Sequence, residues 1–87
     1  MGISQNFIGL IQRTNDSFIR DNIYMIDRTI LAKALKNIDP QYQDKILRNM
    51  TGEASEEVKR IMTSLEISDG ETEAALQEIL GLASRIL

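Results

Sequence analysis

The side chains that could do chemistry in this 87-residue chain are carboxylates, amines and guanidinium groups, because the sequence contains neither histidine nor cysteine. It therefore lacks the ligands that nearly all structural zinc sites use and the usual general base at neutral pH. It also lacks a glycine-rich phosphate-binding loop and a G-x-S-x-G turn. We expect a protein without enzymatic activity, cofactor, nucleotide, small-molecule substrate or bound metal.

Closely spaced carboxylates occur at Glu56-Glu57 and at Glu71-x-Glu73. Such pairs can serve acid–base catalysis, but acidic residues are also favoured in the first turns of helices, where they complement the helix dipole. The second interpretation is the stronger one here. If a divalent metal did bind, the acidic run Asp69, Glu71 and Glu73 would be the first place to look.

The overall charge bears on the kind of partner. The formal net charge is −3 and the basic residues form no stripe, so a nucleic-acid partner is not expected. No apolar run approaches the roughly 18 residues of a membrane span, and residues 1–13 do not have the pattern of a signal peptide. We expect a cytoplasmic protein, or a cytoplasmic fragment of a longer one, that binds other proteins and does not insert into a membrane.

The elements that must position these side chains are helices, because apolar residues recur at helical spacing throughout the chain. Three helix starts carry capping signals: Asp27, Asp39 followed by Pro40, and Thr51. The length allows one small domain. We predict a single all-α domain over residues 1–87, a compact bundle of about six short helices, in the segments 4–13, 16–26, 28–35, 40–50, 51–65 and one that opens after 68–70 and reaches 86.

The predicted helix over 51–65 presents a charged face, by which we mean Glu53, Glu56 and Arg60. With Val58 directed inward and about 100° per residue, these three side chains project outward. Glu56 and Arg60 stand four residues apart in the favourable order, which predicts an ion pair. The face is either solvated surface or a contact for a charged partner.

Three other features of the sequence each allow two interpretations. Tyr24 falls away from the apolar side of its segment and should be exposed, as a contact point or as an ordinary surface residue. Met50 and Met62 lie on apolar stripes, which favours core packing over an adaptable binding surface. Gly81 lies inside the last helix, where it either allows a close helix contact or is tolerated.

Two blocks of the sequence resemble a known family. Residues 30–36, ILAKALK, resemble the LALALKG stretch of the flagellar motor switch protein FliG, and residues 44–51, DKILRNMT, resemble its EKILSNMS at matching spacing. Residues 73–79, EAALQEI, resemble VEEAQQEI, and ASRIL at 83–87 stands where the family has ARRLE. The resemblance covers roughly residues 7–87.

The resemblance implies the six-helix C-terminal subdomain of FliG, which lies at the cytoplasmic face of the flagellar basal body and takes up force from the cytoplasmic loop of the stator. It implies no enzymatic activity. The family's functional residues are charges on the helix after NMS, the lysine of ALKG and an arginine in a GPVR turn. The lysine corresponds to Lys36.

The remaining positions depart from the family. Its arginine after NMS corresponds to Glu53 and its first following acid to Arg60, so both signs are reversed, and its second acid corresponds to Ile61. Residues 65–70 carry no GPVR arginine, and the family's MFxF hinge is reduced to Phe7 and Ile8.

Two hypotheses follow. In the first, this is a non-enzymatic rotor or switch domain that contacts the stator cytoplasmic loop, or other rotor components, through Lys36, Glu53, Glu56 and Arg60. In the second, it is a FliG-like adaptor or regulatory paralogue without torque generation, which binds a partner helix in an apolar groove. That groove would use exposed apolar side chains such as Tyr24, Phe7 or Ile11.

Overall fold

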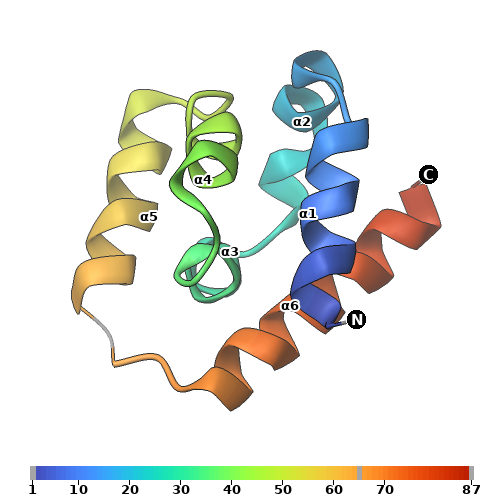
Figure 1. The fold of residues 1–87 in the computed structure, drawn as a ribbon. Helices are drawn as coiled ribbons and strands as arrows, with labels where there is room; N and C mark the ends of the chain where they lie inside the picture. Colours follow the sequence, from blue (N-terminus) through green and yellow to red (C-terminus); the bar gives the residue numbers. More distant parts are fainter. Residues whose placement is uncertain (1, 65, 87) are drawn as a thin grey trace.

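The computed structural model describes residues 2–64 and 66–86, and within these ranges every regular element is a helix. The prediction of an all-α fold is therefore confirmed. Figure 1 shows α5 on one side of the molecule and α1 and α2 on the other, with α3 and α4 between them and α6 crossing beneath. The elements are α1 Ile3–Arg13, α2 Asp16–Asn22, the 3-10 helix η1 Ile23–Met25, α3 Arg28–Leu35, α4 Pro40–Leu47, α5 Gly52–Ser64 and α6 Asp69–Ile86.

Polar side chains begin the helices by accepting hydrogen bonds from backbone N–H groups that have no partner within the helix. Asp27 accepts from Thr29 N at 2.8 Å, and Asp39 precedes Pro40 and accepts from Gln41 N at 3.3 Å. Thr51 Oγ1 accepts from Ala54 N at 3.2 Å. All three predicted caps are confirmed.

Three predicted segments differ from the observed helices, and one of them is 40–50, because α4 ends at Leu47. The segment 16–26 breaks into α2 and η1, and Ile26 has extended backbone because Asp27 begins the next helix. The last helix begins at Asp69, before the end of the predicted 68–70 opening, and at 18 residues it is not short. Its start is a reciprocal capping box, in which Ser68 Oγ accepts from Glu71 N at 3.2 Å and the Glu71 carboxylate reaches back to Ser68.

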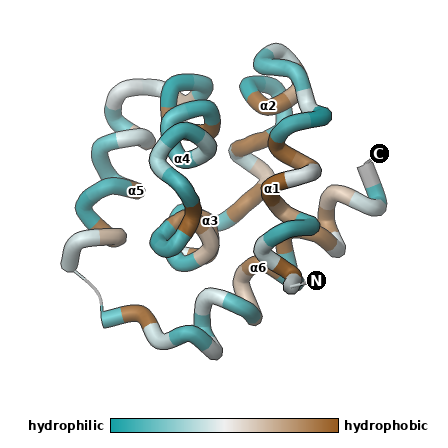
Figure 2. The backbone as a smooth tube through the Cα atoms, viewed as in Figure 1, coloured by the Kyte–Doolittle hydropathy of each residue, from teal (hydrophilic) through white to brown (hydrophobic). Residues whose placement is uncertain are grey.

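The core is built around α3, which packs against both α5 and α6, while α1 packs against α4 and α6. Figure 2 shows hydrophobic residues along the inward sides of α1 and α3 and a largely hydrophilic outer side on α5. A helix enclosed on several sides needs apolar residues around most of its circumference. In α3 this is met by the four buried residues Leu31, Ala32, Ala34 and Leu35.

The apolar spacing of the sequence predicts ten large residues in the helix interiors, and seven of them are buried, namely Leu31, Leu35, Ile46, Leu47, Val58, Leu76 and Ile79. The other three, Ile30, Met62 and Leu80, are half-buried. Ile30 precedes the buried Leu31, and Leu80 follows the buried Ile79. One residue along a helix is a rotation of about 100°, which turns both side chains toward the edge of the buried side of their helices. Met62 packs against the core, as does the half-buried Met50, so both methionines serve core packing as predicted.

Polar side chains also join α4 to its neighbours. Lys45 Nζ donates to the carbonyl oxygen of Ile11 at 2.7 Å, and Gln43 Nε2 donates to that of Leu35 at 2.6 Å. Both acceptors lie at the carboxyl ends of helices, where carbonyl oxygens lack partners within the helix. In the part of the chain that the structure describes, no helix combines the length and the apolar character needed to cross a membrane.

Candidate functional site

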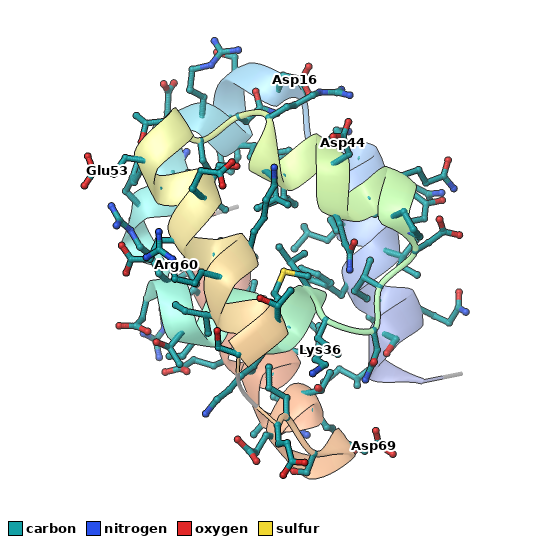
Figure 3. The ribbon with its side chains drawn as sticks, turned by 90° about the vertical axis from the view of Figure 1, so that its left-hand side faces the viewer. Asp16, Lys36, Asp44, Glu53, Arg60 and Asp69 are labelled. Atoms are coloured by element: carbon teal, nitrogen blue, oxygen red, sulfur yellow. The ribbon has the colours of Figure 1, made fainter. Side chains whose placement is uncertain are left out.

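The charged face of α5 is exposed, because the opposite side of the helix packs into the core. Ala54 and Val58 are fully buried. Glu53, Glu56 and Arg60 are all exposed, which confirms the predicted orientation. Figure 3 shows Glu53 near the start of α5 and Arg60 further along the same side of the helix.

The ion pairs on α5 differ from the predicted one. Glu56 Oε1 lies 3.8 Å from Lys59 Nζ, three residues further along the helix. Among the described residues, Glu56 forms no ion pair with Arg60. The prediction of a Glu56–Arg60 pair was wrong, because residues three and four apart are similarly close on a helix and here the lysine takes the carboxylate. Among described residues, neither Glu53 nor Arg60 forms an ion pair, so both charges are presented to solvent.

Lys36 lies elsewhere. It follows the last residue of α3, where its backbone N–H donates to the carbonyl oxygen of Ala32 at 3.1 Å, and it is half-buried. In Figure 3 it appears on the other flank of α5 from Glu53 and Arg60. The fold thus brings three of the four proposed contact residues onto one helix face, and the fourth, Lys36 at the end of α3, does not belong to that face.

A polar hollow of about 410 Å³ adjoins α5 on the side of η1 and the start of α3. It is lined by Tyr24, Asp27, Arg28 and Glu57, together with Ile23, Ile26, Thr29 and Met50. The Arg28 guanidinium forms an ion pair with the carboxylate of Glu57. The sequence analysis missed this hollow because it joins segments 29 residues apart, Arg28 to Glu57, which no local spacing reveals.

Tyr24 is exposed as predicted, with 51% of its surface accessible. Its hydroxyl oxygen accepts a hydrogen bond from the backbone N–H of Thr51 at 2.9 Å. The side chain therefore joins η1 to the residue that precedes α5, at the edge of the polar hollow.

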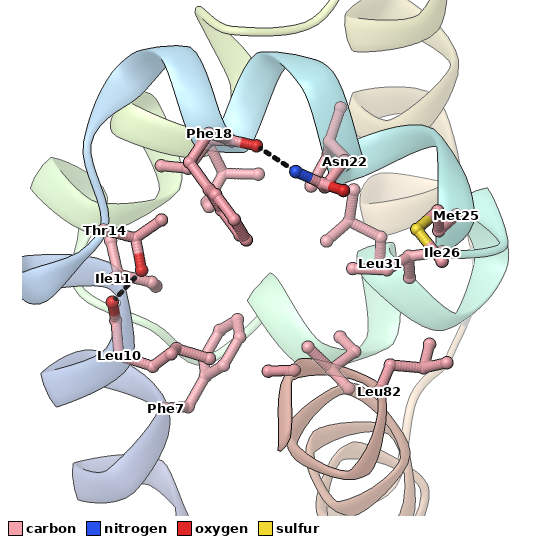
Figure 4. A pocket seen from close by; sticks show the side chains of 15 residues that line it. Phe7, Leu10, Ile11, Thr14, Phe18, Asn22, Met25, Ile26, Leu31 and Leu82 are labelled. Atoms are coloured by element: carbon pink, nitrogen blue, oxygen red, sulfur yellow. Dashed lines mark hydrogen bonds between the residues drawn. The ribbon is translucent and has the colours of Figure 1, made fainter. Parts of the chain in front are cut away.

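An apolar pocket of about 90 Å³ opens on another side of the molecule, between α1, α2, η1 and α6 (Figure 4). Its two polar side chains bond to carbonyls of their own chain segment: Thr14 Oγ1 donates to Leu10 O at 2.6 Å, and Asn22 Nδ2 donates to Phe18 O at 3.0 Å. The remaining lining is apolar and comprises Phe7, Leu10, Ile11, Phe18, Ile19, Ile23, Met25, Ile26, Leu31, Ile46, Ile79, Leu82 and Ala83.

Phe7 and Ile11 line this pocket but are not exposed, since each has 2% of its surface accessible. The expectation that they would be exposed contact residues was wrong. Both belong to the inward side of α1, where α4 and α6 cover them. The exposed apolar residue at this pocket is Met25, with 58% of its surface accessible.

The acidic start of α6 is used within the domain. Glu71 Oε2 lies 3.3 Å from Lys33 Nζ, and the same carboxylate forms the capping box with Ser68. The hydrogen bond from Lys33, followed by those from the Ser68 backbone and hydroxyl, lowers the pKa of Glu71 below its ordinary value of 4.5. No group of three acidic side chains that could hold a metal ion occurs within residues 2–64 and 66–86.

Comparison with known proteins connects these features to a family. The model of the FliG C-terminal domain matches residues 6–86. The flagellar motor switch protein FliG of Vibrio cholerae serotype O1 is 32% identical over 89 residues, which is 99% of this chain and 24% of that protein. The chain thus spans about a quarter of the relative's length. No solved structure matches.

The match runs through all the helices, from α1 to the end of α6, and agrees with the resemblance seen in residues 30–36 and 44–51. A match of this extent cannot arise from one short motif. The chain belongs to the FliG C-terminal domain family.

Proposed function

We propose that this chain is a non-enzymatic interaction domain of a flagellar motor switch, which contacts the cytoplasmic loop of a stator through the charged face of α5. It acts at the cytoplasmic face of the flagellar basal body and serves motility and chemotaxis through protein contacts alone. Its partners are stator or rotor proteins, and neither nucleic acid nor a small-molecule substrate takes part.

The observation that supports this proposal is the exposure of opposite charges on one side of α5. Glu53 and Arg60 are exposed and unpaired among described residues, while the inner side of the same helix is fixed by Ala54 and Val58. A rigid helix that presents unpaired charges suits rapid, reversible recognition, because surface charges act mainly on association rate and salt dependence.

The test is to neutralise each charge and measure binding to the purified stator loop. Glu53→Gln and Arg60→Gln should leave the melting temperature nearly unchanged, because exposed charges contribute only about 0–1 kcal/mol to folding. Each should weaken binding about two- to fivefold at low ionic strength, and the difference should shrink in salt. Glu73→Gln and Arg85→Gln, exposed on α6, are the matched controls. Equal binding by all four variants would contradict the proposal.

The apolar pocket favours a second candidate function, that of an adaptor. In it, a partner helix inserts one large apolar side chain between α1, α2 and α6, next to the exposed Met25. A concave apolar site surrounded by partly exposed side chains has the form of an interface anchor point.

The same binding assay separates the two candidates. Ala83→Leu adds apolar volume at the wall of the pocket, whereas Ala74→Leu adds it at an exposed position of the same helix. If the stator loop binds through α5, both variants bind like the native chain. Loss of binding on Ala83→Leu alone, with native behaviour of the Glu53 and Arg60 variants, would assign partner binding to the apolar pocket and not to the charged face.

A further inference from the structure

The polar hollow beside α5 is lined by two carboxylates and one guanidinium, those of Asp27, Glu57 and Arg28. Glu57 meets Arg28 through Oε2, and Asp27 uses Oδ1 to cap α3. Among described residues, Glu57 Oε1 and Asp27 Oδ2 have no hydrogen-bond partner. With two carboxylates and one guanidinium, the charged lining of the hollow has an excess of one negative charge.

The rest of the lining suits the body of a long basic side chain. Tyr24 is exposed, and its hydroxyl oxygen accepts a hydrogen bond from the N–H of Thr51. An aromatic face attracts a cation. Ile23, Ile26 and Met50 supply apolar surface, on which the methylene groups of an arginine or lysine can pack while the charged end reaches the carboxylates.

We propose that this hollow receives a basic side chain of the partner, best an arginine, whose charged group lies against Tyr24, Asp27 and Glu57. A planar guanidinium with five donors can hydrogen-bond two carboxylates and stack on a ring, which an ammonium group cannot do as well. The inference rests on the proposed function, because the hollow shares α5 with the charged face and would add a second contact for the same partner.

Removing the charge of Arg28 should strengthen partner binding, whereas removing the acidic groups of the hollow should weaken it. Arg28 occupies one oxygen of Glu57 and repels an incoming cation, so Arg28→Gln should tighten binding of the stator loop about two- to fivefold. Asp27→Asn should weaken binding by a similar factor, and Asn remains a good helix cap, so α3 should stay folded. Tyr24→Leu should also weaken binding. Melting temperatures of all three variants provide the folding control.

These variants separate failure of the inference about the hollow from failure of the proposed function. If Arg28→Gln weakens binding and Asp27→Asn strengthens it, the hollow takes an acidic group and the inference is wrong. If none of the three variants changes binding while Glu53→Gln and Arg60→Gln do, the charged face is supported as the contact and the inference about the hollow is wrong. If the Glu53 and Arg60 variants are also native-like, the proposed function itself fails.

A second measurement needs no partner. Titration of the chain with ethylguanidinium chloride, followed by NMR, should give saturable shift changes centred on Tyr24, Asp27 and Glu57. Ethylammonium chloride should act at the same residues but at higher concentration. Shift changes spread evenly over exposed acidic residues such as Glu53, Glu73 and Glu78 would overturn the assignment of a site.

Discussion

Glu71 combines a cap, an ion pair and a shifted pKa in one side chain. Its carboxylate accepts from Ser68 at the start of α6 and lies 3.3 Å from Lys33 Nζ on α3, so it joins two helices that pack together. These contacts favour the ionised form, which is why the pKa of Glu71 lies below its ordinary value of 4.5.

The lowered pKa predicts a dependence of stability on pH. The ionised Glu71 stabilises the fold above its ordinary pKa of 4.5, and this contribution is lost as the pH falls through the lower folded value. Glu71→Gln should therefore lower the melting temperature at neutral pH but make little difference in acid, where native Glu71 is also uncharged. Glu73→Gln, at an exposed position two residues further on, is the control. If the difference in melting temperature between native Glu71 and Glu71→Gln is the same at all pH values, ionisation of Glu71 does not stabilise the fold.

At the scale of the helices, α6 carries a glycine with no packing role. Gly81 lies inside α6, its φ is not positive, and a Cβ added there would meet nothing within 4 Å. The structure thus decides between the two interpretations of this residue, because no neighbour approaches closely enough to require glycine.

Gly81→Ala should raise the free energy of unfolding by about 0.5–1 kcal/mol, since alanine loses less backbone entropy in a helix. Gly9→Ala in α1, where an added Cβ also meets nothing within 4 Å, should behave similarly. Ala74→Gly, exposed on α6, should lose a comparable amount. Urea denaturation of the three variants checks this, and a destabilising Gly81→Ala would show that glycine is needed.

At the scale of the whole molecule, stability depends on α3, because it separates α5 from α6 and packs against both. Leu35 is 0% exposed in this helix. Leu35→Ala should cost about 2–5 kcal/mol, a large part of the stability of a small domain. Leu80→Ala, at a half-buried position of α6, should cost less. Thermal or urea unfolding measures both, and equal losses would contradict the central role of α3.

The amino-acid sequence by itself determined the local features. The spacing of apolar residues predicted the helices, and Asp27, Asp39 and Thr51 predicted where three of them begin, because capping depends on residues two or three positions apart. The outward direction of Glu53, Glu56 and Arg60 followed equally from helix geometry once Val58 was taken as buried.

Only the tertiary structure decided which surfaces are paired, covered or hollow. The Arg28–Glu57 pair, the burial of Phe7 and Ile11, and the contact of Tyr24 with Thr51 each join residues on different helices. Helical periodicity identifies the apolar side of α1 but not whether α4 and α6 cover it. Packing among helices depends on crossing angles and side-chain shapes that are not encoded in local spacing.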